Sequence, residues 1–253
     1  MNWQPNCAMK SNAERKKATD TLFFAPDIAV NPQLPESESM HAVKVLRLKS
    51  GDCIDATDGK GCFYHCEIIQ PHPKKCVVNI LNRVKHPKSW NYQLQIAFAP
   101  TKSNDRIEWF AEKATEIGID LFLPISCRFS ERKELKSERI ERVVIAAMKQ
   151  SRQATVPLIN KIITFEQFVK QPFEGQKFIA HCHKTEKEKL TNIYSKGGNA
   201  LIAIGPEGDF SEQEVQLAIE YGFKPISLGS NRLRTETACL MACHTIHVLN
   251  DLI

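Results

Sequence analysis

The sequence has no hydrophobic run long enough to cross a membrane. No apolar stretch approaches the roughly 20 residues that a transmembrane helix needs. The first residues also have no apolar segment of the kind that a secretory leader carries, and Glu14 and Asp20 argue against a transit peptide. We therefore expect a cytoplasmic protein with no membrane partner.

Two phosphate-binding motifs are missing as well. No Gly-x-Gly-x-x-Gly follows a predicted strand, and no Gly-x4-Gly-Lys-Ser/Thr occurs anywhere in the chain. Dinucleotide-binding and P-loop proteins depend on these loops to hold phosphate groups. Both classes are therefore excluded.

Metal-binding patterns are sparse, although the chain has nine cysteines. Three clusters stand out: Cys62 with Cys66, His181–His183, and Cys239 with Cys243. None pairs with another cluster at the spacing of a structural zinc site. We expect no metal, and we interpret the cysteines as free thiols in a reducing compartment rather than as a disulfide framework.

Charge of one sign is only slightly in excess. Lys and Arg number 34 against 29 Asp and Glu, a net charge of +5. This bias permits a nucleic acid as partner without demonstrating one. The length of 253 residues fits one large or two smaller domains, and the 42% hydrophobic content supplies a sizeable core.

Pattern and composition divide the chain into three parts. Residues 1–20 are polar and without periodicity, which indicates a disordered extension. Residues 21–88 are mostly strand, with apolar patterns at 52–56, 62–69 and 75–81 and an Asp-Gly hairpin signal between the first two. Residues 91–253 alternate strands with helices, which predicts a parallel sheet covered by helices on both sides.

A short helical pattern in the first part carries basic side chains. His41, Lys44 and Arg47 are spaced three apart and should share one face, while Val43, Leu46 and Val45 are the candidates to face inward. Such a basic face is either a solvated helix surface or a phosphate-binding surface. The pattern alone does not choose between these two interpretations.

Two loops in the second half organise the rest of the chain. The first, Ile204–Ser211, follows an apolar strand pattern, and Ser211 with Glu214 has the spacing of a capping box for a helix that Gly222 ends. The second, Leu228–Ala238, follows another short strand. Ligands bind to loops at the carboxyl ends of strands in open α/β sheets, so we expect one pocket built from both loops.

These loops resemble a known signature. Gly205-Pro206-Glu207-Gly208, Leu228-Gly229 and Leu233–Ala238 occur in the order typical of the RsmE family, in the SPOUT superfamily of knotted methyltransferases. The resemblance implies methylation of uridine N3 in 16S (small-subunit) ribosomal RNA with S-adenosylmethionine. It also implies an RNA-binding, PUA-like β-barrel over residues 21–88, a SPOUT α/β domain with a trefoil knot over residues 91–253, and a homodimer.

The same resemblance assigns candidate residues. For the cofactor these are Ile204, Gly205, Pro206, Glu207, Gly208, Leu228, Gly229, Leu233, Arg234 and Thr237. For ribosomal RNA or the small ribosomal subunit they are His41, Lys44, Arg47, Lys102, Arg152 and Arg232.

Methylation at N3 requires loss of a proton and leaves an anion on the base. Arg234 is the candidate to stabilise that anion, because a fixed guanidinium supplies preorganised positive charge. Glu207 and Glu236 are the candidates to accept the proton. For Glu236 the alternative role is an ion pair with Arg232 or Arg234 that holds the loop. His181 ends a strand and is either structural or part of the pocket wall.

Three positions depart from the family pattern. Asn231 stands where the family has Arg, Arg232 occupies an aliphatic position, and Asp209 replaces a common Gly. These departures leave three alternatives open. They are a SPOUT methyltransferase with another RNA target, a non-catalytic RNA-binding protein of the same fold, and an α/β protein whose glycines serve only turns.

Overall fold

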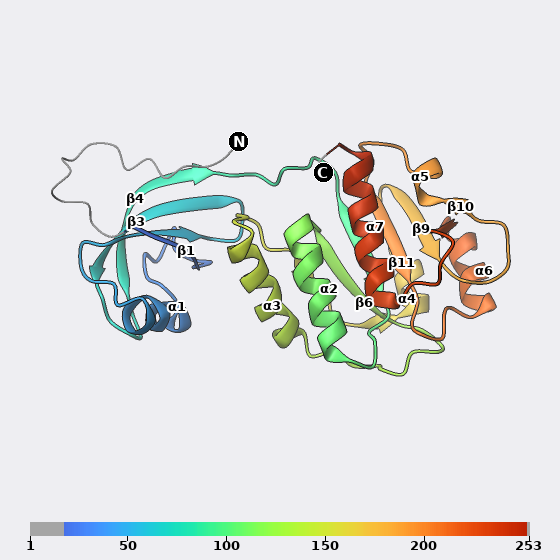
Figure 1. Ribbon diagram of the computed structural model, residues 1–253, viewed down its shortest axis with the longest axis horizontal. Coiled ribbons are helices and arrows are strands. Elements are labelled where there is room, and N and C mark those ends of the chain that lie inside the picture. The colour runs from blue at the N-terminus through green and yellow to red at the C-terminus, as the bar shows by residue number, and fades with distance from the viewer. Residues whose placement is uncertain (1–17, 252–253) are drawn as a thin grey trace. The chain divides into compact units, whose positions relative to one another are not determined.

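The chain folds into two units, each with its own core. The computed structural model describes residues 18–251, and in it the first unit runs to Pro87 and also includes Arg152–Thr155, while the second comprises Lys88–Ser151 and the chain from Val156 onward. Figure 1 shows the mostly β first unit and the α/β second unit. Within residues 18–251, no helix combines the length and apolarity that a bilayer crossing requires.

A four-stranded sheet forms the first unit, in the order β1-β2-β3-β4. β1 is parallel to β2 and the other pairs are antiparallel. Each strand pattern predicted for this unit corresponds to an observed strand. The strands are β1 (Ala18–Phe24), β2 (Cys53–Thr57), β3 (Cys62–Gln70) and β4 (Val77–Lys85). β1 begins inside the stretch predicted to be an extension, and residues 1–17 of that stretch lie outside the described residues.

The basic helix of this unit is shorter than its pattern suggested. α1 (Glu36–Met40) continues into a π-helical turn, η1 (His41–Val45), and the helix ends there. Arg47 adopts a left-handed backbone conformation with φ 54°, so the prediction that it shares a helical face with His41 and Lys44 is wrong. Val45 is 65% exposed and does not face inward.

A segment from the second half of the sequence completes the first unit. The amide of Gly61 donates to the carbonyl oxygen of Ala154 at 2.8 Å, and Lys60 pairs with Thr155 in an antiparallel bridge. Arg152, also in this segment, donates a guanidinium hydrogen bond to the carbonyl oxygen of Asp20 at 2.6 Å. Residues 152–155 therefore contact the turn between β2 and β3 and also Asp20 of β1, and they belong to the first unit.

The second unit is built on a parallel sheet in the order β10-β12-β9-β11-β5-β6-β7, with β8 paired to β6. Its strands are β5 (Leu94–Phe98), β6 (Leu121–Ser126), β7 (Leu158–Ile159), β8 (Ile163–Thr164), β9 (Gln176–Ala180), β10 (Glu188–Lys189), β11 (Ala200–Ile204) and β12 (Lys224–Ser227). Its helices are α2 (Asn104–Ile117), α3 (Ser137–Gln150), α4 (Phe165–Val169), α5 (Leu190–Ile193), α6 (Glu212–Glu220) and α7 (Thr235–Leu249).

Helices cover both faces of this sheet, as predicted. On one face, alternate residues of β5 such as Ile96 and Phe98 pack with residues of α2, α3, α5 and α7. On the other face, Ala97 of the same strand packs with residues of α4 and α6. This alternation places the strand ends between two helical layers (Figure 1).

The predicted start and end of α6 are confirmed. Ser211 forms the capping box with Glu214, and Gly222 follows the end of the helix. By contrast, α2 begins at Asn104 after Ser103, and α3 begins at Ser137 after Lys136. Neither of these two helices has a side-chain cap, so sequence spacing could not locate their first residues.

Candidate functional site

The carboxyl ends of three neighbouring strands open into one cavity. β9, β11 and β12 lie side by side and parallel, so the loops that leave them emerge at the same edge of the sheet. The cavity has a volume of about 660 Å³. The cavity is lined by the end of each strand and the loop that follows it, and by the first turn of α7. The lining segments are residues 180–182 at β9, 204–207 at β11 and 226–234 at β12. The two loops predicted to build one pocket do so.

Direct hydrogen bonds join these two loops. The hydroxyl of Thr235 donates to the carbonyl oxygen of Gly205 at 3.0 Å, and this contact is buried. The guanidinium of Arg232 donates to the carbonyl oxygen of Glu207 at 3.3 Å. The loop after β12 is thereby fastened to the loop after β11 at two points along the cavity wall.

Two glycines fit the backbone to this arrangement. Gly229 has φ 144°, a conformation that side chains with a Cβ rarely adopt, and open space lies beside it. A Cβ at Gly205 would meet the backbone nitrogen and ring of Phe210 at 3.1 Å. Phe210 is fully buried, so the first loop is pressed closely against its own core.

Asp209 connects the loop after β11 to the loop after β9. Its two carboxylate oxygens accept hydrogen bonds from the amides of Cys182 at 2.7 Å and Phe210 at 2.9 Å. The residue has φ 67° and lines the cavity. This departure from the family pattern therefore places a carboxylate in the cavity wall, where two backbone amides donate hydrogen bonds to it.

Most of the residues predicted for the cofactor line the cavity. They are Ile204, Gly205, Pro206, Glu207, Leu228, Gly229, Leu233 and Arg234. Gly208 and Thr237 are not part of the lining. Gly208 instead lies against Phe129, whose Cβ would be 2.9 Å from a Cβ added at this position.

The two predicted acids have different surroundings. Glu207 is exposed, lines the cavity and accepts a hydrogen bond from the amide of Lys102 at 3.2 Å. Glu236 is 8% exposed and does not line the cavity. Its Oε1 lies 3.7 Å from Nε of Arg106 on α2, so the predicted ion pair with Arg232 or Arg234 is wrong.

Arg234 is an exposed residue of the cavity wall at the cap position of α7. Within residues 18–251, its side chain makes no hydrogen bond or ion pair. The hydrogen-bond donors of the guanidinium are therefore available to a bound molecule.

The residues predicted for RNA fall into two groups. Arg232 lines the cavity, and Lys102 lies beside Glu207 with its Nζ 3.4 Å from Oε2 of Glu131. The other four, His41, Lys44, Arg47 and Arg152, belong to the first unit. Of these, Lys44 and Arg47 are exposed, and the His41 ring lies 6.0 Å from that of Phe23.

The loop after β9 also contributes to the cavity, although the sequence offered only His181 from it as a candidate. His181, Cys182 and Lys187 all line the cavity. His181 is 7% exposed, and burial together with the nearby Lys187 ammonium lowers its pKa to about 4. The available signal was its position at a strand end, at the sheet edge where the other two loops emerge.

No group of three or more His, Cys, Asp or Glu side chains in the described part of the chain is arranged to hold a metal ion. Cys239 and Cys243 are fully buried in α7, and burial raises the pKa of both thiols. Both side chains belong to the core that α2 and α7 share, and the Cys243 thiol donates a hydrogen bond to the carbonyl oxygen of Gly118 at 3.2 Å.

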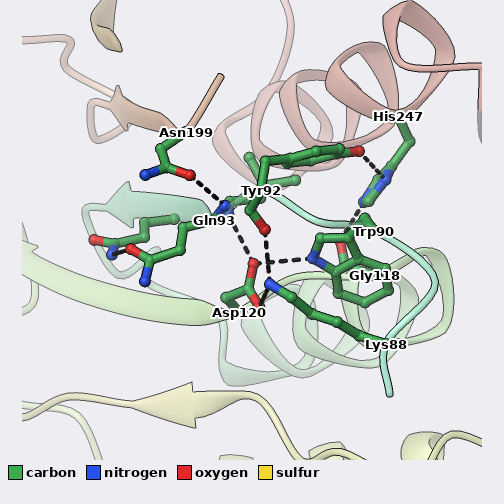
Figure 2. A network of polar contacts seen from close by, with 10 residues as sticks. Lys88, Trp90, Tyr92, Gln93, Gly118, Asp120, Asn199 and His247 are labelled. Atoms are coloured by element: carbon green, nitrogen blue, oxygen red, sulfur yellow. Dashed lines mark hydrogen bonds and ion pairs between the residues drawn. The ribbon is translucent and has the colours of Figure 1, made fainter. Parts of the chain in front are cut away.

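A polar network anchors the other end of the wall helix α7 (Figure 2). His247 accepts or donates at both ring nitrogens, with Nε2 2.7 Å from the carbonyl oxygen of Gly118 and Nδ1 2.7 Å from the hydroxyl of Tyr92. Because the Gly118 carbonyl can only accept, Nε2 carries the proton and Nδ1 accepts from Tyr92. This arrangement uses neutral His247 to tie α7 to the turn after α2.

Asp120 organises the rest of this network. Its carboxylate accepts from Nζ of Lys88 at 2.6 Å, Nε1 of Trp90 at 3.0 Å and the amide of Leu94 at 2.8 Å. Figure 2 shows these groups converging where β5 begins. The start of β5 and the C-terminal end of α7 are thus held together, and α7 is fixed at the end opposite its cavity-lining first turn.

Known proteins share this architecture. A family model described as an RNA methyltransferase domain matches residues 88–247, and one described as an RNA methyltransferase PUA domain matches residues 34–81. The chain is 31% identical over 223 residues to the ribosomal RNA small subunit methyltransferase E of Rickettsia conorii. The aligned region covers 87% of this chain and 90% of the relative.

Two crystal structures match over almost the whole chain. A probable rRNA-methyltransferase from Porphyromonas gingivalis is 41% identical with a TM-score of 0.87, covering 91% of this chain and 98% of the other. The ribosomal RNA small subunit methyltransferase E of Neisseria gonorrhoeae, bound to S-adenosyl methionine, is 28% identical with a TM-score of 0.80, covering 90% and 97%. From the family models and these relatives, the chain belongs to the RNA methyltransferase family of ribosomal RNA small subunit methyltransferase E.

Proposed function

We propose that this protein methylates N3 of a uridine in 16S (small-subunit) ribosomal RNA, with S-adenosylmethionine as the methyl donor. The observation that carries the proposal is the single cavity formed by the loops after β11 and β12 in a chain of this family. The buried hydrogen bond from Thr235 to Gly205 makes that cavity a defined site rather than a gap between loops.

The cavity suits S-adenosylmethionine in size and character. Its volume of about 660 Å³ lies within the range typical of small-molecule sites. Ile204, Leu228 and Leu233 supply apolar wall, while the glycines expose backbone amides and carbonyls. The donor has no phosphate, so the absence of a phosphate-binding loop is consistent with it. Of the predicted residues, Gly208 and Thr237 would support the loops rather than touch the donor.

The bound donor supplies a methyl group on a cationic sulfonium. The protein must stabilise the uracil anion left when N3 loses its proton, whose charge is shared with the flanking carbonyl oxygens. Arg234 is placed for this role, because its guanidinium lines the cavity and has no partner among the described residues. A fixed charge of this kind lowers the activation barrier by roughly 3–4 kcal/mol.

Glu207 is the better candidate to accept the N3 proton. It lines the cavity, and among residues 18–251 its carboxylate accepts a single hydrogen bond, from the amide of Lys102 at 3.2 Å. Glu236 lies outside the cavity lining and beside Arg106. We therefore assign Glu236 to fastening α7 against α2, and proton transfer to Glu207.

RNA binding would involve both units. We assign it to the PUA-like residues 21–88, with Lys44 and Arg47 as exposed phosphate contacts and His41 and Arg152 as further candidates. In the methyltransferase domain, residues 91–253, Lys102 and Arg232 would approach the RNA near the cavity. Arg232 then supplies the cation that the family has at position 231.

We also propose a cytoplasmic homodimer that acts on the small ribosomal subunit, with a trefoil knot in the second unit. Exposed apolar side chains support the dimer. Met241 and Val248 lie on the outer side of α7, and Trp109 lies on α2, which packs beside it. Such side chains are often covered by a second subunit.

The decisive experiment is mass mapping of modified nucleosides in 16S ribosomal RNA from a strain that lacks this gene. We expect loss of one 3-methyluridine and its return when the wild-type gene is supplied. Unchanged 3-methyluridine, with loss of another methylated nucleoside, would identify a different RNA target. RNA binding without measurable S-adenosylmethionine binding would identify a non-catalytic RNA-binding protein.

A further inference from the structure

One buried polar side chain in the cavity wall has no partner. His181 follows β9, is 7% exposed and lines the cavity. Both ring nitrogens, Nδ1 and Nε2, are inaccessible and make no hydrogen bond within residues 18–251. Burying such atoms unpaired costs free energy, and nearly all buried polar groups in proteins are paired.

Three polar neighbours of His181, namely His183, Lys187 and Asp209, make hydrogen bonds to backbone groups. The His183 ring lies 5.3 Å away, but its Nε2 contacts the carbonyl oxygen of Phe210 at 2.7 Å. Lys187 donates to the carbonyl oxygens of His181 and His183 at 2.9 and 2.5 Å. The Asp209 carboxylate is held by backbone amides. The cavity is therefore the remaining direction from which His181 can obtain a partner.

The charge state of His181 suits a cationic ligand. Burial, Lys187 and His183 lower its pKa, Asp209 raises it, and the result is about 4. At neutral pH the imidazole is uncharged, with one nitrogen that donates and one that accepts. A neutral ring offers hydrogen bonds without repelling a sulfonium or an ammonium group.

We propose that His181 is a ligand-binding residue whose imidazole completes its hydrogen bonding with a polar group of bound S-adenosylmethionine. This inference rests on the proposed function and extends the site to the loop after β9. His181 acts by binding and positioning the donor, and it takes no part in proton transfer.

The test compares His181→Leu with His247→Leu, the same change at two buried histidines. Donor affinity is measured by calorimetry with S-adenosylmethionine, and stability by thermal unfolding without ligand. For His181→Leu we expect about tenfold weaker binding, because a polar group of the donor loses its partner. Its melting temperature without ligand should stay equal or rise, because two unpaired polar atoms are removed.

The control should behave in the opposite way. His247 has partners on both nitrogens, so His247→Leu should lower the melting temperature and leave donor affinity within about twofold of wild type. If His247→Leu does not fold, Tyr92→Phe removes one of the same hydrogen bonds with less disturbance. Nitrogen-15 resonances of His181 should also shift when S-adenosylmethionine is added to the wild-type protein at neutral pH.

Two outcomes separate this inference from the function on which it rests. If wild type binds S-adenosylmethionine and His181→Leu binds it equally well, His181 is not a ligand-binding residue although the proposed function stands. If wild type does not bind S-adenosylmethionine, the proposed function fails and this inference fails with it.

Discussion

The hydroxyl of Thr235 donates a buried hydrogen bond to the carbonyl oxygen of Gly205, and the two residues are 30 positions apart in sequence. Gly205 is the first residue after β11 and Thr235 is the first residue of α7, so this hydrogen bond links the two loops that form the cavity. Parallel neighbours in the sheet bring both loops to one edge, and the hydroxyl fixes their separation.

Removal of this hydroxyl should weaken both the fold and the cavity. In Thr235→Val the shape is kept but the Gly205 carbonyl loses its donor, which should lower the free energy of unfolding by about 1–3 kcal/mol. For a chain of this size that corresponds to roughly 2–4 °C in melting temperature per kcal/mol. Thermal unfolding is the measurement, and Thr235→Ser, which keeps the hydroxyl, should remain close to wild type. Equal melting temperatures for valine and wild type would show that the bond does not hold the loops.

Arg234 should contribute to the reaction and little to stability. Arg234→Ala removes an exposed guanidinium that has no partner among the described residues, so the melting temperature should be unchanged. The methyl-transfer rate should fall roughly 100- to 1,000-fold if the guanidinium stabilises the uracil anion. The measurement is single-turnover methyl incorporation into small-subunit RNA. Arg142→Ala, on the exposed side of α3, is the control, and full activity of Arg234→Ala would assign the anion to another residue.

The two acids should separate into a reactive and a structural residue. Glu207→Gln changes a residue of the cavity wall and should reduce methyl transfer while stability stays near wild type. Glu236→Gln removes the charge beside Arg106, so its main effect should be on the packing of α7 against α2. Parallel measurements of methyl incorporation and thermal unfolding distinguish the two. The assignment reverses if Glu236→Gln is the variant that folds normally and loses activity.

Stability should decrease as the solution becomes acidic. Burial lowers the pKa of His247 from 6.5, opposed by the Gly118 carbonyl and Asp120 and aided by His244 and Lys88. The unfolded chain therefore binds a proton more readily than the folded chain, and the free energy of unfolding falls as pH drops below about 6.5. The slope from one such group is at most about 1.4 kcal/mol per pH unit. His181, with its pKa also lowered, adds to the loss in the same direction.

Denaturant unfolding between pH 7.5 and 5 measures this dependence. His247→Gln should be less stable at neutral pH and should show a shallower fall on acidification, since the titrating ring is gone. An unchanged slope in His247→Gln would assign the pH dependence to other groups.

Which segments of the second unit form strands and which form helices could be predicted from the local hydrophobic pattern. Alternation of apolar runs with helical stripes predicted a parallel sheet with two helical layers, and Ser211 with Glu214 marked the start of α6 correctly. Local pattern succeeds here because burial on both faces of a strand and on one side of a helix leaves a periodic record in the sequence. The two loops could be placed at strand ends for the same reason.

Which residues contact each other across the fold could not be predicted, because these contacts leave no local pattern in the sequence. Glu236 pairs with Arg106 rather than with the arginines of its own loop, because α2 packs against α7. Residues 152–155 complete the first unit although they follow α3, and His181 joins the cavity because β9 lies between β11 and β12. Periodicity reports which residues are buried, whereas the order of strands and the packing of helices determine which groups meet.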